Sequence, residues 1–115
     1  MTKSVLLQKA AAFSLEVIRY YQWLCTEKKE FVMSKQLLRS GTSIGANINE
    51  AYYAVSTADF INKMQTAVKE AAESEYWFYL LEESGYFTPD FMKAKNLLDE
   101  VKRMLVSTLN TAKKK

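Results

Sequence analysis

The chain has 115 residues, of which 49% are hydrophobic and 25% charged, and this length fits one domain around a single core. It contains no histidine and one cysteine, which excludes imidazole catalysis, histidine metal sites and an intrachain disulfide. The 16 basic and 13 acidic residues leave a net charge of +3, too small by itself to indicate nucleic-acid binding. With neither a signal peptide nor an apolar run of membrane-spanning length, we expect a cytoplasmic protein that does not enter a membrane.

Hydrophobic residues in the first half of the chain recur at steps of three and four, the spacing of one side of an α-helix. The pattern predicts a first helix over about residues 4–27 and a second over about 33–54. A polar cluster at 26–30 separates them. The inward residues expected for the second helix are Leu37, Gly41, Ile44, Ile48, Ala51 and Val55.

A third helix is expected over about residues 57–84. Ser56, followed three residues later by Asp59, has the form of a capping box at its start. Gly85 can adopt the left-handed conformation that ends many helices.

The fourth helix is expected over about residues 89–111. Thr88 is a candidate N-cap, Pro89 suits the first helical position, and Asp90 is favoured there by the helix dipole. Because short connections make each helix turn back beside the previous one, the sequence predicts an all-α, antiparallel up-down-up-down four-helix bundle over residues 1–115.

Large side chains cover the whole circumference of the third helix near its end. Six follow one another from Tyr76 to Leu81, and one bundle core cannot bury them all. Aromatic patches of this kind are enriched where subunits meet, so we expect a homo-oligomer, with a wide monomer core as the alternative. The expected interface residues are Tyr52, Tyr53, Tyr76, Trp77 and Leu80.

Two glycines, Gly41 and Gly45, lie inside the second predicted helix. Each costs about 1 kcal/mol relative to alanine in a helix interior. Close approach of a neighbouring backbone, or of a bulky ring such as Trp77, would offset this cost; simple tolerance is the alternative. The Gly-x-x-x-Gly spacing is a weak phosphate-loop signal, since no strand precedes it.

Polar residues form a row on the side of the second helix opposite its apolar stripe, and the third helix carries a comparable row. Two interpretations remain open: two solvated helix faces, or a partly buried hydrogen-bond network in which Arg39 reaches across to carboxylates. The candidate network consists of Arg39, Ser43, Asn47, Glu50, Glu70 and Glu73.

Glu70 and Glu73 also raise the question of a metal site or an acid-base pair. Carboxylate bundles that bind paired metals use Glu-x-x-His repeats, so without histidine only an oxygen-only site for a hard cation remains. No nucleophile or pocket motif accompanies the two glutamates. We therefore expect no enzymatic activity, no metal and no cofactor.

Basic residues gather around the first connection and along the fourth helix. In a closed ring, symmetry would repeat each positive charge and raise the local potential for phosphates. Ordinary solubility lysines are the alternative interpretation. The nucleic-acid candidates are Lys28, Lys29, Lys35, Lys93, Lys95, Lys102 and Arg103.

The strings QLLRSGTSIGANINEAYYA and DFINKMQTAVKEAAESEYWFYLLEESGYF resemble the bacterial four-helix-bundle family of 23S rRNA intervening-sequence proteins. One departure is Tyr52-Tyr53, where many relatives have Gly-Phe/Tyr and a basic residue. The first family motif falls on Arg39, Ser43, Ile44, Ala46, Asn47, Ile48, Glu50 and Ala51. The second falls on Ala67, Glu70, Ala71, Glu73, Tyr76 and Trp77.

The resemblance implies a four-helix bundle assembled into a ring, commonly a pentamer, and favours the network over the solvated faces. Relatives encoded in ribosomal RNA genes have no settled role, whereas related accessory proteins of diversity-generating retroelements resemble basic rings that bind a reverse transcriptase and nucleic acid. Fold kinship does not transfer that role. Two functions are expected to compete: an oligomer that binds RNA or a ribonucleoprotein, and a protein-interaction scaffold.

Overall fold

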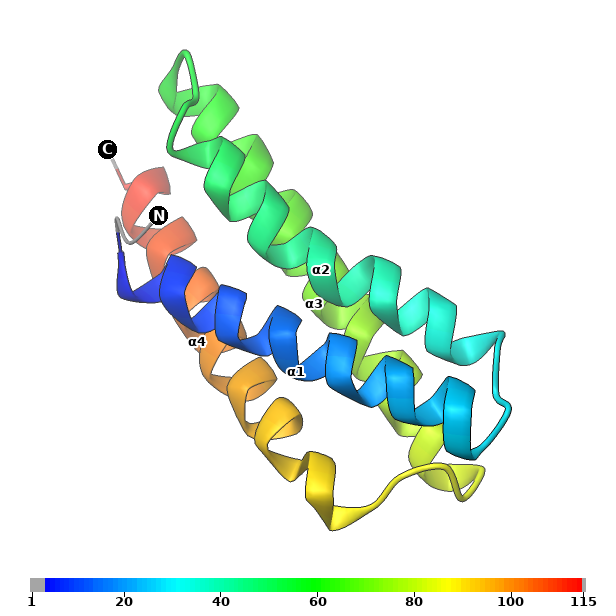
Figure 1. Cartoon of the computed structure of the whole chain (residues 1–115). Coiled ribbons are helices and arrows are strands. Elements are labelled where there is room, and N and C mark those ends of the chain that lie inside the picture. The colour runs from blue at the N-terminus through cyan, green and yellow to red at the C-terminus, as the bar shows by residue number, and fades with distance from the viewer. Residues whose placement is uncertain (1–3, 115) are drawn as a thin grey trace.

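A computed structural model describes residues 4–114, and this part of the chain folds into four long α-helices (Figure 1). Successive helices run in opposite directions, as the sequence predicts. One turn of 3-10 helix, η1, precedes the last helix, and the described residues include no strand. The elements are α1 (Val5–Glu27), α2 (Met33–Ala51), α3 (Thr57–Glu83), η1 (Pro89–Phe91) and α4 (Met92–Lys113).

The four helices close around one core. Each helix packs against two neighbours, in the cyclic order α1, α2, α3, α4. The bundle measures 47 × 25 × 21 Å, and the start of α1 and the end of α4 lie at the same end of it (Figure 1). All four helices contribute fully buried side chains, among them Phe13, Ile44, Met64 and Leu105. The all-α, up-down-up-down architecture is therefore confirmed.

Side chains cap the first turns of three helices. The Ser4 hydroxyl accepts a hydrogen bond from the Leu7 amide at the start of α1, and the Ser56 hydroxyl accepts from the Asp59 amide at the start of α3, both at 3.0 Å. The Glu30 carboxylate accepts from amides in the first turn of α2, including that of Ser34 at 2.7 Å. The cap at Ser56 was predictable from sequence spacing, whereas the cap by Glu30 was not recognised.

The second helix ends at Ala51, three residues before the predicted position 54. The amides of Tyr52 and Tyr53 bond to the carbonyls of Asn49 and Glu50, three residues back, so the chain closes into a turn. Val55, expected to point inward, is 93% exposed. The helical spacing of Val55 is therefore coincidental, because the helix has already ended.

The start of the fourth helix also differs from the prediction. Thr88 has the extended backbone of an N-cap, but its side chain makes no capping hydrogen bond. Its Oγ1 atom is buried without a hydrogen-bond partner among the described residues. Residues 89–91 form the 3-10 turn η1, whose Phe91 packs on Tyr20 with ring centroids 4.6 Å apart.

Candidate functional site

Arg39 joins α2 to α3 by contacting two carboxylates. Its Nη2 atom donates to Oε2 of Glu73, and its Nη1 atom lies 3.5 Å from Oε1 of Glu70. The same Oε2 atom of Glu73 accepts from the indole Nε1 of Trp77 at 3.0 Å. Glu70, Glu73 and Trp77 lie on one side of α3 because they are spaced by three and four residues. We call these four residues the Arg39 cluster.

The Arg39 cluster lies at the edge of the bundle, in partial contact with solvent. The side chains of Arg39, Glu73 and Glu70 are 50%, 34% and 19% exposed. The hydrogen bond from Arg39 holds the pKa of the Glu73 carboxyl below its usual value, and the bond from Trp77 acts in the same direction. The bond with Glu73 raises the pKa of the Arg39 guanidinium, although burial opposes this. Both groups are therefore charged at neutral pH.

The other three residues of the predicted network do not join this cluster. Ser43 Oγ donates to the Arg39 carbonyl at 2.6 Å, and Asn47 Nδ2 donates to the Ser43 carbonyl at 2.8 Å, so both bond within α2. Glu50 pairs instead with Lys63 of α3 at 2.8 Å, and this bond raises the pKa of Lys63. Of the six predicted residues, three therefore belong to the Arg39 cluster, two bond within α2 and one pairs with Lys63.

A buried polar pair between α2 and α3 escaped the sequence interpretation. Ser40 and Ser74 are fully buried, and their hydroxyl oxygens lie 2.8 Å apart. Each serine lies three or four residues from core positions, Leu37 on α2 and Phe78 on α3. Residues with this spacing lie on the same face of a helix, so the spacing from core residues indicates that both serines are buried.

The two glycines of α2 face α1, where the sequence predicts a close backbone or a bulky ring such as Trp77. The ring near Gly41 is that of Phe13, 3.4 Å from the position of an added Cβ atom, and not that of Trp77. A Cβ atom at Gly41 would lie 3.1 Å from both γ carbons of Val17. At Gly45 it would lie 3.6 Å from Cβ of Ala10, an ordinary contact. A methyl group at Gly41 would therefore require Val17 to shift by a few tenths of an ångström, whereas one at Gly45 would fit without a shift.

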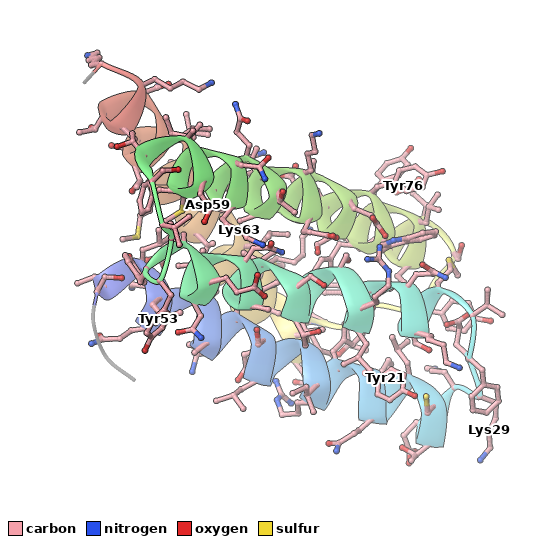
Figure 2. All side chains as sticks on the ribbon, turned by 90° about the horizontal axis from the view of Figure 1, so that it is seen from above. Tyr21, Lys29, Tyr53, Asp59, Lys63 and Tyr76 are labelled. Carbon is pink, nitrogen blue, oxygen red and sulfur yellow. The ribbon has the colours of Figure 1, made fainter. Side chains whose placement is uncertain are left out.

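The predicted interface residues differ in how much surface they offer. Tyr53 and Tyr76 are 68% and 55% exposed and lie near opposite ends of the bundle (Figure 2). Trp77 and Leu80 are half-buried, and Tyr52 is half-buried with its hydroxyl 2.6 Å from the Ser4 hydroxyl. Trp77 and Tyr52 thus already have partners within one chain, and the interface role of all five stays a prediction.

The seven basic candidates fall into two groups. Lys95 pairs with Glu82 at 2.5 Å, and Lys102 pairs with Glu75 at 2.6 Å, so neighbouring carboxylates already balance these charges. The remaining five are exposed and form no ion pair with residues 4–114, although the Lys28 ammonium lies 5.5 Å from the ring centre of Trp23. These five are Lys28, Lys29, Lys35, Lys93 and Arg103.

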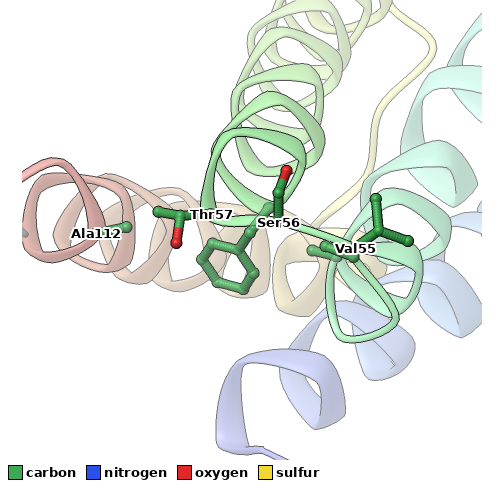
Figure 3. A pocket seen from close by; sticks show the side chains of 7 residues that line it. Val55, Ser56, Thr57 and Ala112 are labelled. Atoms are coloured by element: carbon green, nitrogen blue, oxygen red, sulfur yellow. The ribbon is translucent and has the colours of Figure 1, made fainter.

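Two surface hollows lie away from the Arg39 cluster. One, of about 390 Å³, lies between the α2–α3 turn and the end of α4, beside Val55, Thr57 and Ala112, and no titratable side chain lines it (Figure 3). The other, of about 490 Å³, lies between α1 and α2. Within the described residues, no three cysteines or carboxylates are grouped to hold a metal ion, and no helix has both the length and the apolarity to cross a membrane.

Two comparisons with known proteins, one by sequence family and one by structure, indicate the same family. Residues 2–107 match the family described as 23S rRNA-intervening sequence protein. A crystal structure of a protein of unknown function from the S23 ribosomal protein family of Bacteroides thetaiotaomicron has 48% sequence identity and a TM-score of 0.88. The similarity covers 91% of this chain and 98% of that one. No curated protein matches. The chain belongs to the 23S rRNA-intervening sequence protein family.

Proposed function

We propose that this chain is a cytoplasmic RNA-binding protein without catalytic activity that works as a homo-oligomer. The ring of five implied by the family resemblance is the expected size. The observation that carries the proposal is a group of exposed lysines at the α1–α2 turn, Lys28, Lys29 and Lys35, which form no ion pair with the described residues. Repeated around an oligomer, such a group attracts phosphates far more strongly than one chain does.

The nearby Glu30 does not cancel these positive charges by pairing with them. Its carboxylate accepts hydrogen bonds from the amides of Ser34 at 2.7 Å and Met33 at 3.1 Å, so it is bound to the N-terminus of α2. Lys29 adopts a left-handed backbone, with a φ of 54°, and its side chain points out from the end of the bundle (Figure 2). The lysine group therefore faces solvent.

A salt titration with a labelled single-stranded RNA tests the proposal. Affinity should fall steeply between about 50 and 200 mM salt, because each phosphate contact releases counterions. Lys29→Gln/Lys35→Gln should weaken binding and lower the slope of log K against log salt by about 2. Lys95→Gln/Lys102→Gln removes the same charge from paired lysines and should have a much smaller effect. Absence of binding at low salt would contradict the proposal.

A protein-interaction scaffold is the second candidate function. It is favoured by exposed tyrosines on α3, because Tyr76 and Tyr79 are 55% and 59% exposed. Tyrosine is enriched in protein interfaces. In this case the chain should bind no RNA at low salt, and Tyr76→Ala should abolish the retention of a partner protein that the unmodified chain retains.

A further inference from the structure

The turn between α1 and α2 holds an aromatic ring out in solvent. Phe31 is 57% exposed, and the next residue, Val32, is 73% exposed. The Phe31 ring is not part of the buried core, and it packs on no other aromatic ring within residues 4–114. A single exposed apolar residue is common on protein surfaces, so the surroundings of Phe31 decide what it can do.

Hydrogen bonds fix the backbone on both sides of this ring. Before it, the Glu30 amide donates to the Leu24 carbonyl at 3.0 Å. After it, the Val32 and Ser34 amides donate to the Glu30 carboxylate at 3.3 and 2.7 Å, and the Ser34 hydroxyl donates to the Glu30 carbonyl at 2.7 Å. The backbone therefore presents Phe31 in a set position, and a group that is already in position loses less entropy on binding.

Exposed lysines flank the ring along the chain. Lys29 lies two residues before Phe31, and Lys35 lies four residues after it, in the first turn of α2. Neither forms an ion pair within the described part of the chain, and the Lys29 side chain points out from the end of the bundle (Figure 2). The acidic neighbours are Glu27, which is exposed and precedes the lysines, and Glu30, whose carboxylate is bound to amides. The ring therefore lies between two positive charges.

We infer that Phe31 stacks on an unpaired base of RNA bound at the α1–α2 turn, while Lys29 and Lys35 hold neighbouring phosphates. The inference rests on the RNA binding of the proposed function and names the form of RNA that this site selects. Aromatic side chains among basic residues are typical of sites that bind single strands, because every base offers a flat face for stacking. Within a duplex the bases stack on one another, so Phe31 would find no base face to contact.

An anionic lipid surface is the competing partner for a turn that combines lysines with apolar side chains. The exposed apolar side chains of this turn are those of Phe31 and Val32. A single myristoyl chain, which has more apolar carbons than these two side chains together, gives only marginal membrane binding. Stacking on a base needs only one ring. The turn therefore suits unpaired RNA better than a membrane.

Fluorescence anisotropy with a labelled single-stranded RNA and a blunt duplex of the same length tests the inference. Phe31→Ala should weaken binding of the single strand by about 5-fold to 150-fold, the range for one stacked base, and leave binding of the duplex unchanged. Phe31→Tyr keeps a ring face and should bind as the unmodified chain does. Val32→Ala is the matched control, because it removes exposed apolar surface beside the ring and should not change affinity. Both positions are exposed, so folding should be preserved, and circular dichroism confirms it.

The salt dependence separates the ring from the charges. Stacking releases no counterions, so Phe31→Ala should weaken single-strand binding by the same factor at about 50 and 200 mM salt. The slope of log K against log salt should therefore match that of the unmodified chain, whereas Lys29→Gln/Lys35→Gln lowers it by about 2. A lower slope for Phe31→Ala would show that the substitution acts through phosphate contacts, and stacking would be wrong.

The RNA outcomes separate this inference from the proposed function. If the unmodified chain binds RNA with a steep salt dependence and Phe31→Ala binds the single strand equally well, stacking is wrong, although RNA binding stands. If Phe31→Ala weakens the single strand and the duplex equally, or Val32→Ala weakens the single strand as much, the ring does not select unpaired bases. If neither RNA binds at low salt, the proposed function is wrong and the inference fails with it.

Two further measurements address other partners for the ring. Light scattering of Phe31→Ala should give the mass of the unmodified chain; a lower mass would place the ring between subunits and overturn the inference. Sedimentation with vesicles of phosphatidylserine and phosphatidylcholine should show no binding that depends on Phe31. If Phe31→Ala abolishes vesicle binding and leaves RNA binding intact, the ring contacts lipid and the inference is wrong.

Discussion

The hydroxyl oxygens of Ser40 and Ser74 lie 2.8 Å apart where α2 meets α3, and both side chains are fully buried. A buried hydroxyl without a partner is costly, so Ser74 depends on Ser40, whereas the Ser40 hydroxyl also lies 3.4 Å from the Leu37 carbonyl. Small side chains at these positions also let the two helices approach closely. The pair therefore favours one alignment of α2 on α3, and this alignment brings Arg39 to Glu73.

A double-mutant cycle at these serines should reveal strong coupling. Ser40→Ala should lower the free energy of unfolding by about 1–2 kcal/mol, because it removes the partner of the buried Ser74 hydroxyl. Ser74→Ala should cost less, because the Ser40 hydroxyl keeps its 3.4 Å contact with the Leu37 carbonyl. The double variant should cost less than the sum of the two, because no hydroxyl remains to satisfy. Urea denaturation measures all three. Strict additivity would show that the two hydroxyls do not depend on each other.

Arg39→Ala should cost about 1 kcal/mol or less in urea denaturation of the single chain. Arg39 is half exposed, and ion pairs in contact with water contribute little to stability. Lys35→Ala, at an exposed position on the same helix without an ion pair to the described residues, should change stability by less than about 0.5 kcal/mol. A loss of about 3 kcal/mol for Arg39→Ala would be typical of a buried pair and would contradict the exposed position of this cluster.

The Arg39–Glu73 contact should make stability depend on acid pH. The pKa of Glu73 is lowered from 4.5, chiefly by the hydrogen bond from Arg39, so the folded state binds this proton less readily than the unfolded state. Its stabilising effect is therefore fully present above about pH 5 and is lost as the pH falls through the lowered pKa.

Glu73→Gln isolates this effect, because glutamine keeps a carbonyl that can accept from the Trp77 indole but removes the charge facing Arg39. The unmodified chain should be more stable than Glu73→Gln at pH 7, and urea denaturation at an acid pH below 4.5 should show this advantage shrinking. An advantage of equal size at both pH values would mean that Glu73 acts through packing or neutral hydrogen bonds.

The four helices were predictable because local signals and hydrophobic spacing agree along most of the chain. Ser56 caps α3 as predicted, and Gly85 adopts the left-handed backbone, with a φ of 83°, just after that helix. The end of α2 was not predictable, because Tyr52 bonds to the distant Ser4 and the chain turns there. The spacing of apolar residues, taken alone, predicts that the helix continues to Val55.

The candidate site was predictable only where its partners are fixed by helix spacing and opposite charge. Arg39 reaches Glu70 and Glu73 as the network interpretation proposed. Ser43 and Asn47 occupy the same row, but short polar side chains can bond to carbonyls of their own helix, and these two do. Residue spacing cannot distinguish a bond to the neighbouring helix from a bond within the same helix, because in both cases the side chain lies on the same face.

Gly41→Ala and Gly45→Ala should change stability in opposite directions, although both lie in α2. Alanine gains about 1 kcal/mol over glycine in a helix interior. At Gly41 the new methyl group would lie 3.1 Å from both γ carbons of Val17, a stiff β-branched residue, so overpacking should outweigh this gain by about 1–2 kcal/mol. At Gly45 the nearest atom is 3.6 Å away, so the gain should remain. Thermal and urea unfolding measure both effects, and equal stabilisation by the two substitutions would show that α1 moves aside to admit a methyl group at Gly41.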